Sequence, residues 1–113
     1  MIFEIRNYHF DPARFEAYKQ WGQSEAVPYL ERELDLVGFW VSTPDAAEVL
    51  GRPHDDLGTA NVTWIIRWKD REQRHEVMAR IFASKEWEDI FSRVPGGMPS
   101  YLRIEWRFAD AVA

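Results

Sequence analysis

The side chains best suited to chemistry stand near the start of the chain, where Tyr8 is followed directly by His9. A phenol and an imidazole can both carry a proton, and imidazole titrates near neutral pH. A histidine at the end of a strand is also commonly a surface residue. Arg67 lies much later in the chain and could hold the negative oxygen that such a reaction creates. We therefore take Tyr8, His9 and Arg67 as the candidate catalytic residues.

The remaining histidines give weaker signals. His54 is followed by Asp55 and Asp56, but three adjacent residues on one loop cannot surround a metal ion. His75 stands among charged neighbours, which is typical of a solvated helix face. The chain has no Cys, so thiolate metal sites, disulfides and cysteine nucleophiles are excluded. We predict no metal site and no cofactor.

Aromatic residues are the other informative set, with six Trp, four Tyr and seven Phe in 113 residues. Large rings can fill the layer between a sheet and its helices by themselves. They can also line a cavity for a flat apolar ligand, with a few polar side chains as anchors. Buried indole N–H groups need polar partners, which favours the cavity. The candidate ligand-binding residues are Asn7, Trp21, Trp40, Trp64, Phe82 and Trp87.

Four segments that could position these residues have the residue types of β-strands. Residues 2–9 and 101–108 alternate between apolar and polar side chains, and residues 36–43 and 61–69 are rich in β-branched and aromatic residues. The connection over 44–60 is too long for a tight turn, and we predict one turn of helix followed by a mobile loop there.

Two helical segments separate the strands. Asp11 and Pro12 predict the start of a first helix that runs to about Asp35, and Pro28 predicts a kink over residues 24–27. Asp70 predicts the start of a second helix, with Val77, Met78, Ile81 and Phe82 as its buried stripe. Ser84 is expected to cap a further short helix.

The order of these elements is β-α-β-β-α-β, which is the ferredoxin-like arrangement of a four-stranded antiparallel sheet with both helices on one face. We predict a single α+β domain over residues 1–113, with 44–60 inserted between the second and third strands. Alternation predicts the faces of the sheet. We expect the helices to cover Phe3, Ile5, Val62, Trp64, Ile66, Leu102, Ile104 and Trp106, and the other face to carry Glu4, Arg6, Tyr8, Thr63, Ile65, Arg67, Arg103, Glu105 and Arg107.

That second face has two interpretations. It can be a solvated face with cross-strand ion pairs, or it can pack against its copy in a homodimer, where the charges satisfy one another. Arginine greatly outnumbers lysine in the chain, and the planar guanidinium suits shared, desolvated carboxylate contacts. This favours the dimer.

Charge and composition exclude several classes of function. A net charge of −5 without a basic block argues against a nucleic-acid partner. No apolar run approaches the length of a membrane span, and the first residues do not resemble a signal peptide. We therefore expect a cytoplasmic protein.

Four motifs carry a resemblance to a known family. They are Glu4-Ile-Arg6-Asn-Tyr8, Val37-Gly38-Phe39-Trp40, Trp64-x-x-x-Trp68 with Arg74 beyond it, and Ser84-x-x-Trp87. With these motifs the chain resembles the NIPSNAP family over nearly its whole length. It differs in the long 44–60 segment and in having Trp68 where another aromatic, often Tyr, is typical.

The resemblance implies a dimeric α/β barrel, in which two ferredoxin-like protomers pair their sheets and pockets lie between sheet and helices. It implies a small-molecule-binding protein, which could be a cofactor-independent, monooxygenase- or isomerase-like enzyme acting on an aromatic or polyketide-like substrate. The alternative is a non-catalytic dimeric interaction or stress-associated module. The family has no agreed reaction, and fold-level analogy cannot choose between these functions.

Overall fold

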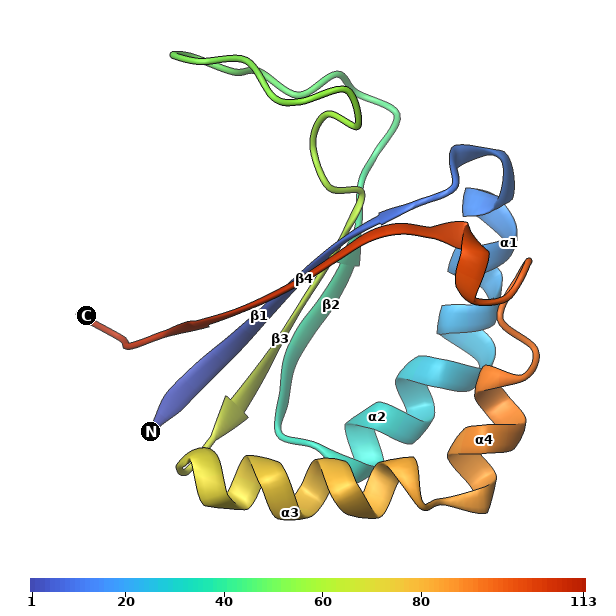
Figure 1. Ribbon diagram of the computed structural model, residues 1–113, viewed down its shortest axis with the longest axis vertical. Coiled ribbons are helices and arrows are strands. Elements are labelled where there is room, and N and C mark those ends of the chain that lie inside the picture. The colour runs from blue at the N-terminus through green and yellow to red at the C-terminus, as the bar shows by residue number, and fades with distance from the viewer.

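The computed structural model describes all 113 residues and has the predicted ferredoxin-like architecture. Its strands are β1 (Ile2–Phe10), β2 (Leu36–Val41), β3 (Val62–Trp68) and β4 (Tyr101–Ala109). They form one antiparallel sheet in the order β2-β3-β1-β4, with β2 and β4 at its edges. All helices lie on one side of this sheet (Figure 1).

The first helical segment is interrupted where the kink is predicted. A 3-10 turn at Pro12–Arg14 leads into α1 (Phe15–Trp21), a π-helical turn follows at Gly22–Ala26, and α2 (Val27–Glu33) completes the segment. Pro28 has no N–H to donate to the carbonyl four residues before it, and the wider π-helical turn accommodates this gap. The bend allows α1 and α2 to follow the twisted sheet.

The second helical segment consists of α3 (Arg71–Phe82) and α4 (Lys85–Phe91), and both predicted caps are present. The Asp70 side chain accepts a hydrogen bond from the Gln73 N–H, and the Ser84 hydroxyl accepts one from the Trp87 N–H. The predicted buried stripe of α3 is wrong in its extent. Ile81 is buried, but Val77 and Met78 are only half-buried, and Phe82 is 67% exposed.

The assignment of β1 to the two faces of the sheet is a clear error of the sequence analysis. Glu4, Arg6 and Tyr8 lie opposite Ile66, Trp64 and Val62 of β3, on the face that the helices cover. All three are buried, whereas Phe3 and Ile5 are only half-buried and lie on the other face. The sequence predicts that these polar residues of β1 lie on the open face, either solvated or in a dimer interface, but they find partners under the helices of the same chain.

The open face of the sheet carries a mixed set of side chains. Asn7 accepts a 2.6 Å hydrogen bond from the Thr63 hydroxyl and lies 3.4 Å from Glu105. Ile65 is half-buried and Arg67 is exposed beside them. The pairing of this face with a second copy stays a prediction.

The segment between β2 and β3 extends away from the sheet (Figure 1) and contains no helix, so the predicted helical turn is wrong. Asp55 holds it to β4 through an ion pair with Arg103. Gly51 and Gly58 have φ values of +87° and +71°, which side-chain-bearing residues rarely adopt, so each marks a turn in this segment.

Candidate functional site

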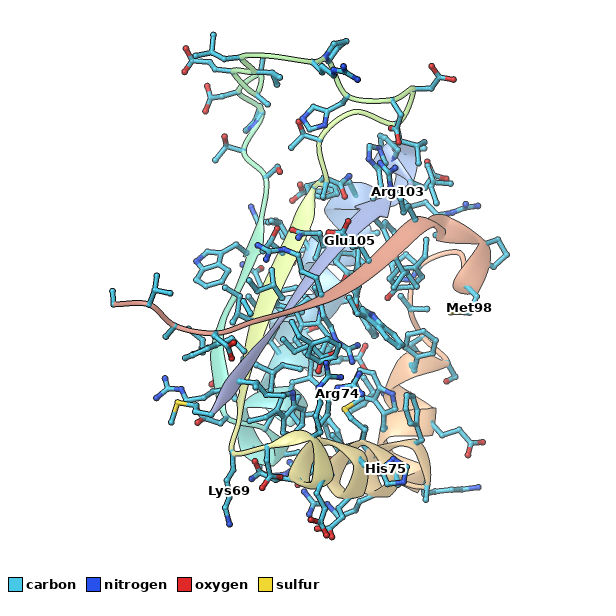
Figure 2. The ribbon with its side chains drawn as sticks, turned by 60° about the vertical axis from the view of Figure 1, so that its left-hand side comes forward. Lys69, Arg74, His75, Met98, Arg103 and Glu105 are labelled. Carbon is cyan, nitrogen blue, oxygen red and sulfur yellow. The ribbon has the colours of Figure 1, made fainter.

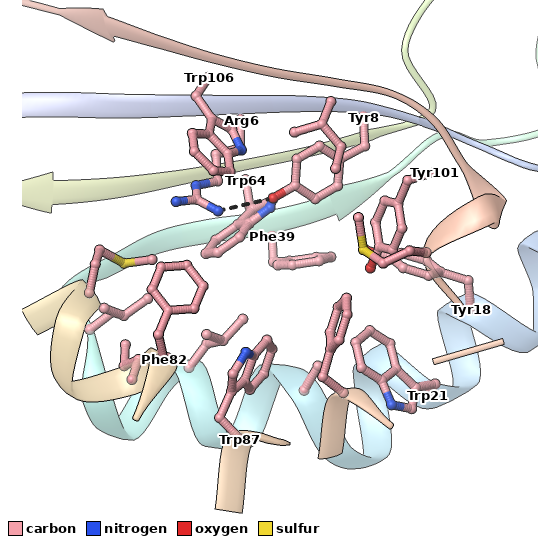
Figure 3. Close-up of a pocket in the computed structure, with 18 of the residues that line it drawn as sticks. Arg6, Tyr8, Tyr18, Trp21, Phe39, Trp64, Phe82, Trp87, Tyr101 and Trp106 are labelled. Atoms are coloured by element: carbon pink, nitrogen blue, oxygen red, sulfur yellow. Dashed lines mark hydrogen bonds between the residues drawn. The ribbon is translucent and has the colours of Figure 1, made fainter. Parts of the chain in front are cut away.

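A cavity of about 640 Å³ lies between the helix-covered face of the sheet and the helices (Figure 3). Every strand and each of the helices α1 to α4 contributes to its wall. Of its 20 lining residues, 17 are hydrophobic. They are Arg6, Tyr8, Tyr18, Trp21, Ala26, Leu30, Leu34, Phe39, Trp64, Met78, Ile81, Phe82, Trp87, Glu88, Phe91, Ser92, Met98, Tyr101, Ile104 and Trp106.

Geometry explains why the aromatic layer does not close. The helices cover β4 only in part. Arg71 and Arg74 of α3 lie over Phe108, but Ile104 and Trp106, which face the same side as Tyr8 and Arg6, remain 39% and 48% exposed. Phe82 and Met98 in the same cavity wall are 67% and 54% exposed. Exposed apolar side chains that line one cavity are typical of a binding-site mouth.

The rings around the cavity hold one another in fixed orientations. Tyr8 and Tyr101 meet edge to face at 5.5 Å, and Phe39 stacks on Trp64 at 5.4 Å. Such pairs contribute about 0.5–1.5 kcal/mol each beyond their area burial. The wall is therefore built of rigid aromatic surfaces.

Arg6 gives this apolar cavity a polar end. Its guanidinium lies between Trp64 and Trp106, at 4.8 Å and 4.4 Å from the ring centroids. Its Nη1 donates a 3.2 Å hydrogen bond to the Tyr8 hydroxyl oxygen (Figure 3). The cation is 5% exposed and is held by the two indole faces.

Glu4 lies behind Arg6 and is fully buried. Its carboxylate accepts hydrogen bonds from Arg6 Nε at 2.8 Å, Trp68 Nε1 at 2.9 Å, and Arg74 Nε and Nη2 at 2.8 and 3.1 Å. Figure 2 shows Arg74 on α3, so this network ties β1 and β3 to the helix. Burial by itself raises the pKa of Glu4, but the hydrogen bond from Arg74, the charge of Arg6 and the bond from Trp68 together hold that pKa below its usual value.

Three polar groups of the cavity wall have hydrogens without an acceptor. Arg6 Nη2 lies 2.8 Å from Glu4 Oε2 but makes no hydrogen bond with acceptable geometry. Trp64 Nε1 is buried with no partner. The Tyr8 hydroxyl accepts from Arg6, and its own proton has no acceptor in the protein.

The other two tyrosines of the wall are held as neutral phenols. Burial, with Tyr101 and Tyr8 nearby, raises the pKa of Tyr18 far above its usual value. Burial and the neighbouring Tyr8 likewise raise the pKa of Tyr101. Neither residue has the character of a general base near neutral pH.

The structure places five of the predicted site residues on the cavity wall. They are Tyr8, Trp21, Trp64, Phe82 and Trp87. Arg6, which the sequence analysis assigned to the open face, joins them. The alternation along β1 contained this signal, but only the register with β3 reveals which set of side chains faces inward.

The other four predicted site residues, Asn7, His9, Trp40 and Arg67, do not line this cavity. Asn7 and His9 have the opposite parity to Arg6 and Tyr8 on β1, and Arg67 lies beside Asp35 on the open face. Trp40 pairs with Thr63 and is 50% exposed. Its ring lies over Gly38, where even a Cβ atom would collide with it.

The weaker histidine candidates are all separate from the cavity. His54 is exposed in the long loop, and neighbouring Asp55 is engaged with Arg103. His75 is exposed on α3 (Figure 2). No three His, Cys, Asp or Glu side chains are grouped so that they could hold a metal ion.

None of the helices is both long and apolar enough to cross a membrane.

The chain is similar in fold to several solved structures. No family model and no curated protein matches the chain. Among solved structures, it is similar to an uncharacterized NIPSNAP domain protein from Burkholderia xenovorans, with 18% identity, a TM-score of 0.76, and coverage of 100% of this chain and 96% of that one. It is also similar to a NIPSNAP family protein with unknown function from Agrobacterium tumefaciens, with 19% identity, a TM-score of 0.74, and coverage of 96% and 86%.

A more distant likeness is to an antibiotic biosynthesis monooxygenase, with 12% identity, a TM-score of 0.59, and coverage of 100% of both chains. At these identities the likeness concerns the fold. The chain has the ferredoxin-like fold of the solved NIPSNAP domain structures.

Proposed function

We propose that this protein binds a small, flat, largely apolar molecule between its sheet and its helices. The observation that carries the proposal is the cavity of about 640 Å³ with 17 hydrophobic residues among the 20 that line it. Ligand sites in proteins typically occupy about 300–1,000 Å³ and combine apolar walls with a few polar groups. Arg6 and Tyr8 supply the polar groups here.

A catalytic version of this proposal is a cofactor-independent, monooxygenase- or isomerase-like enzyme acting on an aromatic or polyketide-like substrate. With His9 and Arg67 outside the cavity, its candidate residues are Tyr8 and Arg6. A fixed cation and a phenol in an apolar site stabilise a developing oxyanion more strongly than water does. The Arg6–Tyr8 contact is the observation in favour of catalysis.

The alternative is a non-catalytic interaction or stress-associated module. The long loop between β2 and β3 supports this alternative, because Leu50 is fully exposed there and Val49 is 46% exposed. A homodimer is compatible with both functions, and half-exposed Phe3, Ile5 and Ile65 on the open face of the sheet support it. Cytoplasmic location remains part of the proposal.

The test is a titration of the purified protein with neutral aromatic compounds, followed by intrinsic Trp fluorescence and calorimetry. Trp21, Trp64, Trp87 and Trp106 line the cavity, so a bound ring should quench the emission saturably. Trp87→Ala should weaken binding, and the matched variant Trp40→Ala should leave the affinity unchanged. If no compound in a broad panel binds, or if Trp40→Ala is the damaging variant, the proposal is wrong.

A further inference from the structure

The polar end of the cavity offers hydrogen-bond donors and lacks free acceptors. Trp64 Nε1 and the Tyr8 hydroxyl proton have no acceptor in the protein, and Arg6 Nη2, although 2.8 Å from Glu4 Oε2, makes no well-aligned hydrogen bond to it; all three residues line the cavity. Figure 3 shows Arg6, Tyr8 and Trp64 close together on the sheet side of the cavity. A buried polar group without a partner destabilises the protein, so a ligand that supplies acceptors is favoured there.

The charge around Arg6 determines which of these acceptor-bearing ligands is favoured. Glu4 is the one acidic group in hydrogen-bond contact with Arg6, and it is shared with Arg74. Two guanidinium groups therefore face a single carboxylate, and this cluster, in which Arg6 is buried and Arg74 is partly exposed, carries a net positive charge. Apart from Arg6, Glu88 is the one charged lining residue, and it is exposed on α4.

The indole rings on either side of Arg6 compensate its charge only in part. Cation–π contacts with Trp64 and Trp106 attract the guanidinium face. They give no acceptor to the N–H groups at its edge, and Nη2 remains without a hydrogen bond. An anionic oxygen would satisfy both the charge and the donors, through the charge-assisted hydrogen bonds that guanidinium groups favour.

We infer that the ligand is an organic anion, a flat aromatic or polycyclic acid whose carboxylate lies against Arg6 and Tyr8 while its ring system occupies the apolar cavity. This inference rests on the proposed function and adds the ligand's charge to it. Arg6 is then a selectivity residue, and Glu4 with Arg74 positions it.

The experiment uses two dyes that differ by one group. Anilinonaphthalenesulfonate is N-phenylnaphthylamine with an added sulfonate group, so one dye is an anion and the other is neutral, and both fluoresce on entering apolar sites. Because one charge-assisted contact commonly changes affinity by about tenfold or more, the wild-type protein should bind the anion at least about tenfold more tightly. Naphthoate and naphthamide form a second matched pair for calorimetry.

Substitutions of Arg6 and Tyr8 test whether these residues cause the preference for anions. Arg6→Met keeps the length of the side chain and should weaken the anions by at least about tenfold, with the neutral compounds nearly unchanged. Tyr8→Phe removes one oxygen, preserves the ring packing and should weaken the anions several-fold. Arg107→Met removes an exposed arginine of β4 and serves as the matched control.

Each outcome decides the inference. Equal binding of charged and neutral partners to the wild type, or equal weakening of both by Tyr8→Phe, overturns the anion assignment and leaves the proposed function intact. Binding of neither dye and neither naphthalene compound overturns both. The wild-type comparison and Tyr8→Phe decide the matter even if Arg6→Met does not fold.

Discussion

At the scale of single residues, Glu4 is the centre of the structure's polar chemistry. It is fully buried and receives hydrogen bonds from Arg6, Trp68 and Arg74. Breaking one partner of a buried ion pair leaves an uncompensated charge and typically costs about 3–5 kcal/mol. The contribution of the Glu4 carboxylate to stability is therefore measured by replacing it, because no single contact gives the whole effect.

Glu4→Gln should lower the free energy of unfolding by about 3 kcal/mol, because Arg6 and Arg74 then lack their carboxylate. Urea unfolding followed by circular dichroism measures the change. Asp55→Asn is the control, since Asp55 also pairs with an arginine but is exposed, and surface pairs contribute about 0–1 kcal/mol. Equal effects of the two substitutions would contradict the account of Glu4.

The stability of the protein should also depend on pH through Glu4. The hydrogen bonds and charges of its arginine partners hold the pKa of Glu4 in the folded protein below its usual value, so the unfolded chain binds a proton more readily than the folded one. The stabilisation is fully present above about pH 4.5 and is lost as the pH falls through the folded-state pKa. Unfolding measured from neutral to acid pH should show a shallower decline for Glu4→Gln; parallel curves would refute this origin.

At the scale of elements, the ends of the helices could be predicted from neighbouring residues, whereas the buried face of β1 depends on residues far away in the sequence. Asp11, Asp70 and Ser84 cap their helical segments as the sequence indicates, and Pro28 follows the expected irregularity. The face of β1 could not be predicted, because the partner that makes Glu4 buriable, Arg74, lies 70 positions away. Trp40 was misplaced for a related reason, since an apolar residue in an edge strand can occupy either face.

The cap of α4 gives a prediction at this scale. Ser84→Ala removes the acceptor for the Trp87 N–H and should cost about 1 kcal/mol of stability. Because α4 carries Trp87 and Phe91 of the cavity wall, ligand affinity should fall with it. Ser42→Ala in the exposed segment after β2 is the control and should change neither quantity. A fully retained stability in Ser84→Ala would show that the cap is unimportant.

At the scale of the whole molecule, an incompletely covered sheet explains both of its unusual surfaces. On one side the helices leave Ile104 and Trp106 of β4 exposed and a cavity remains. On the other side, Phe3, Ile5 and Ile65 lie half-exposed without any layer above them. The sequence predicted the aromatic layer but not its openness, because the latter depends on where α3 and α4 end relative to β4.

The open face yields a prediction about assembly. If a second copy covers it, light scattering should give twice the chain mass of 13.4 kDa. Ile65→Glu would place a charge on this face and should shift the mass toward that of one chain. A monomeric wild type at high concentration would remove the dimer proposal and leave the cavity unaffected.

The central claim is that a flat ligand binds inside the cavity, and the indole N–H signals of the six Trp residues test it most directly. In a nitrogen–proton correlation spectrum titrated with naphthoate, the signals of Trp21, Trp64, Trp87 and Trp106 should shift together and saturate. The signal of Trp40, on the opposite face of the sheet, should stay in place. Shifts confined to Trp40, or unchanged cavity signals at saturating ligand, would contradict the account.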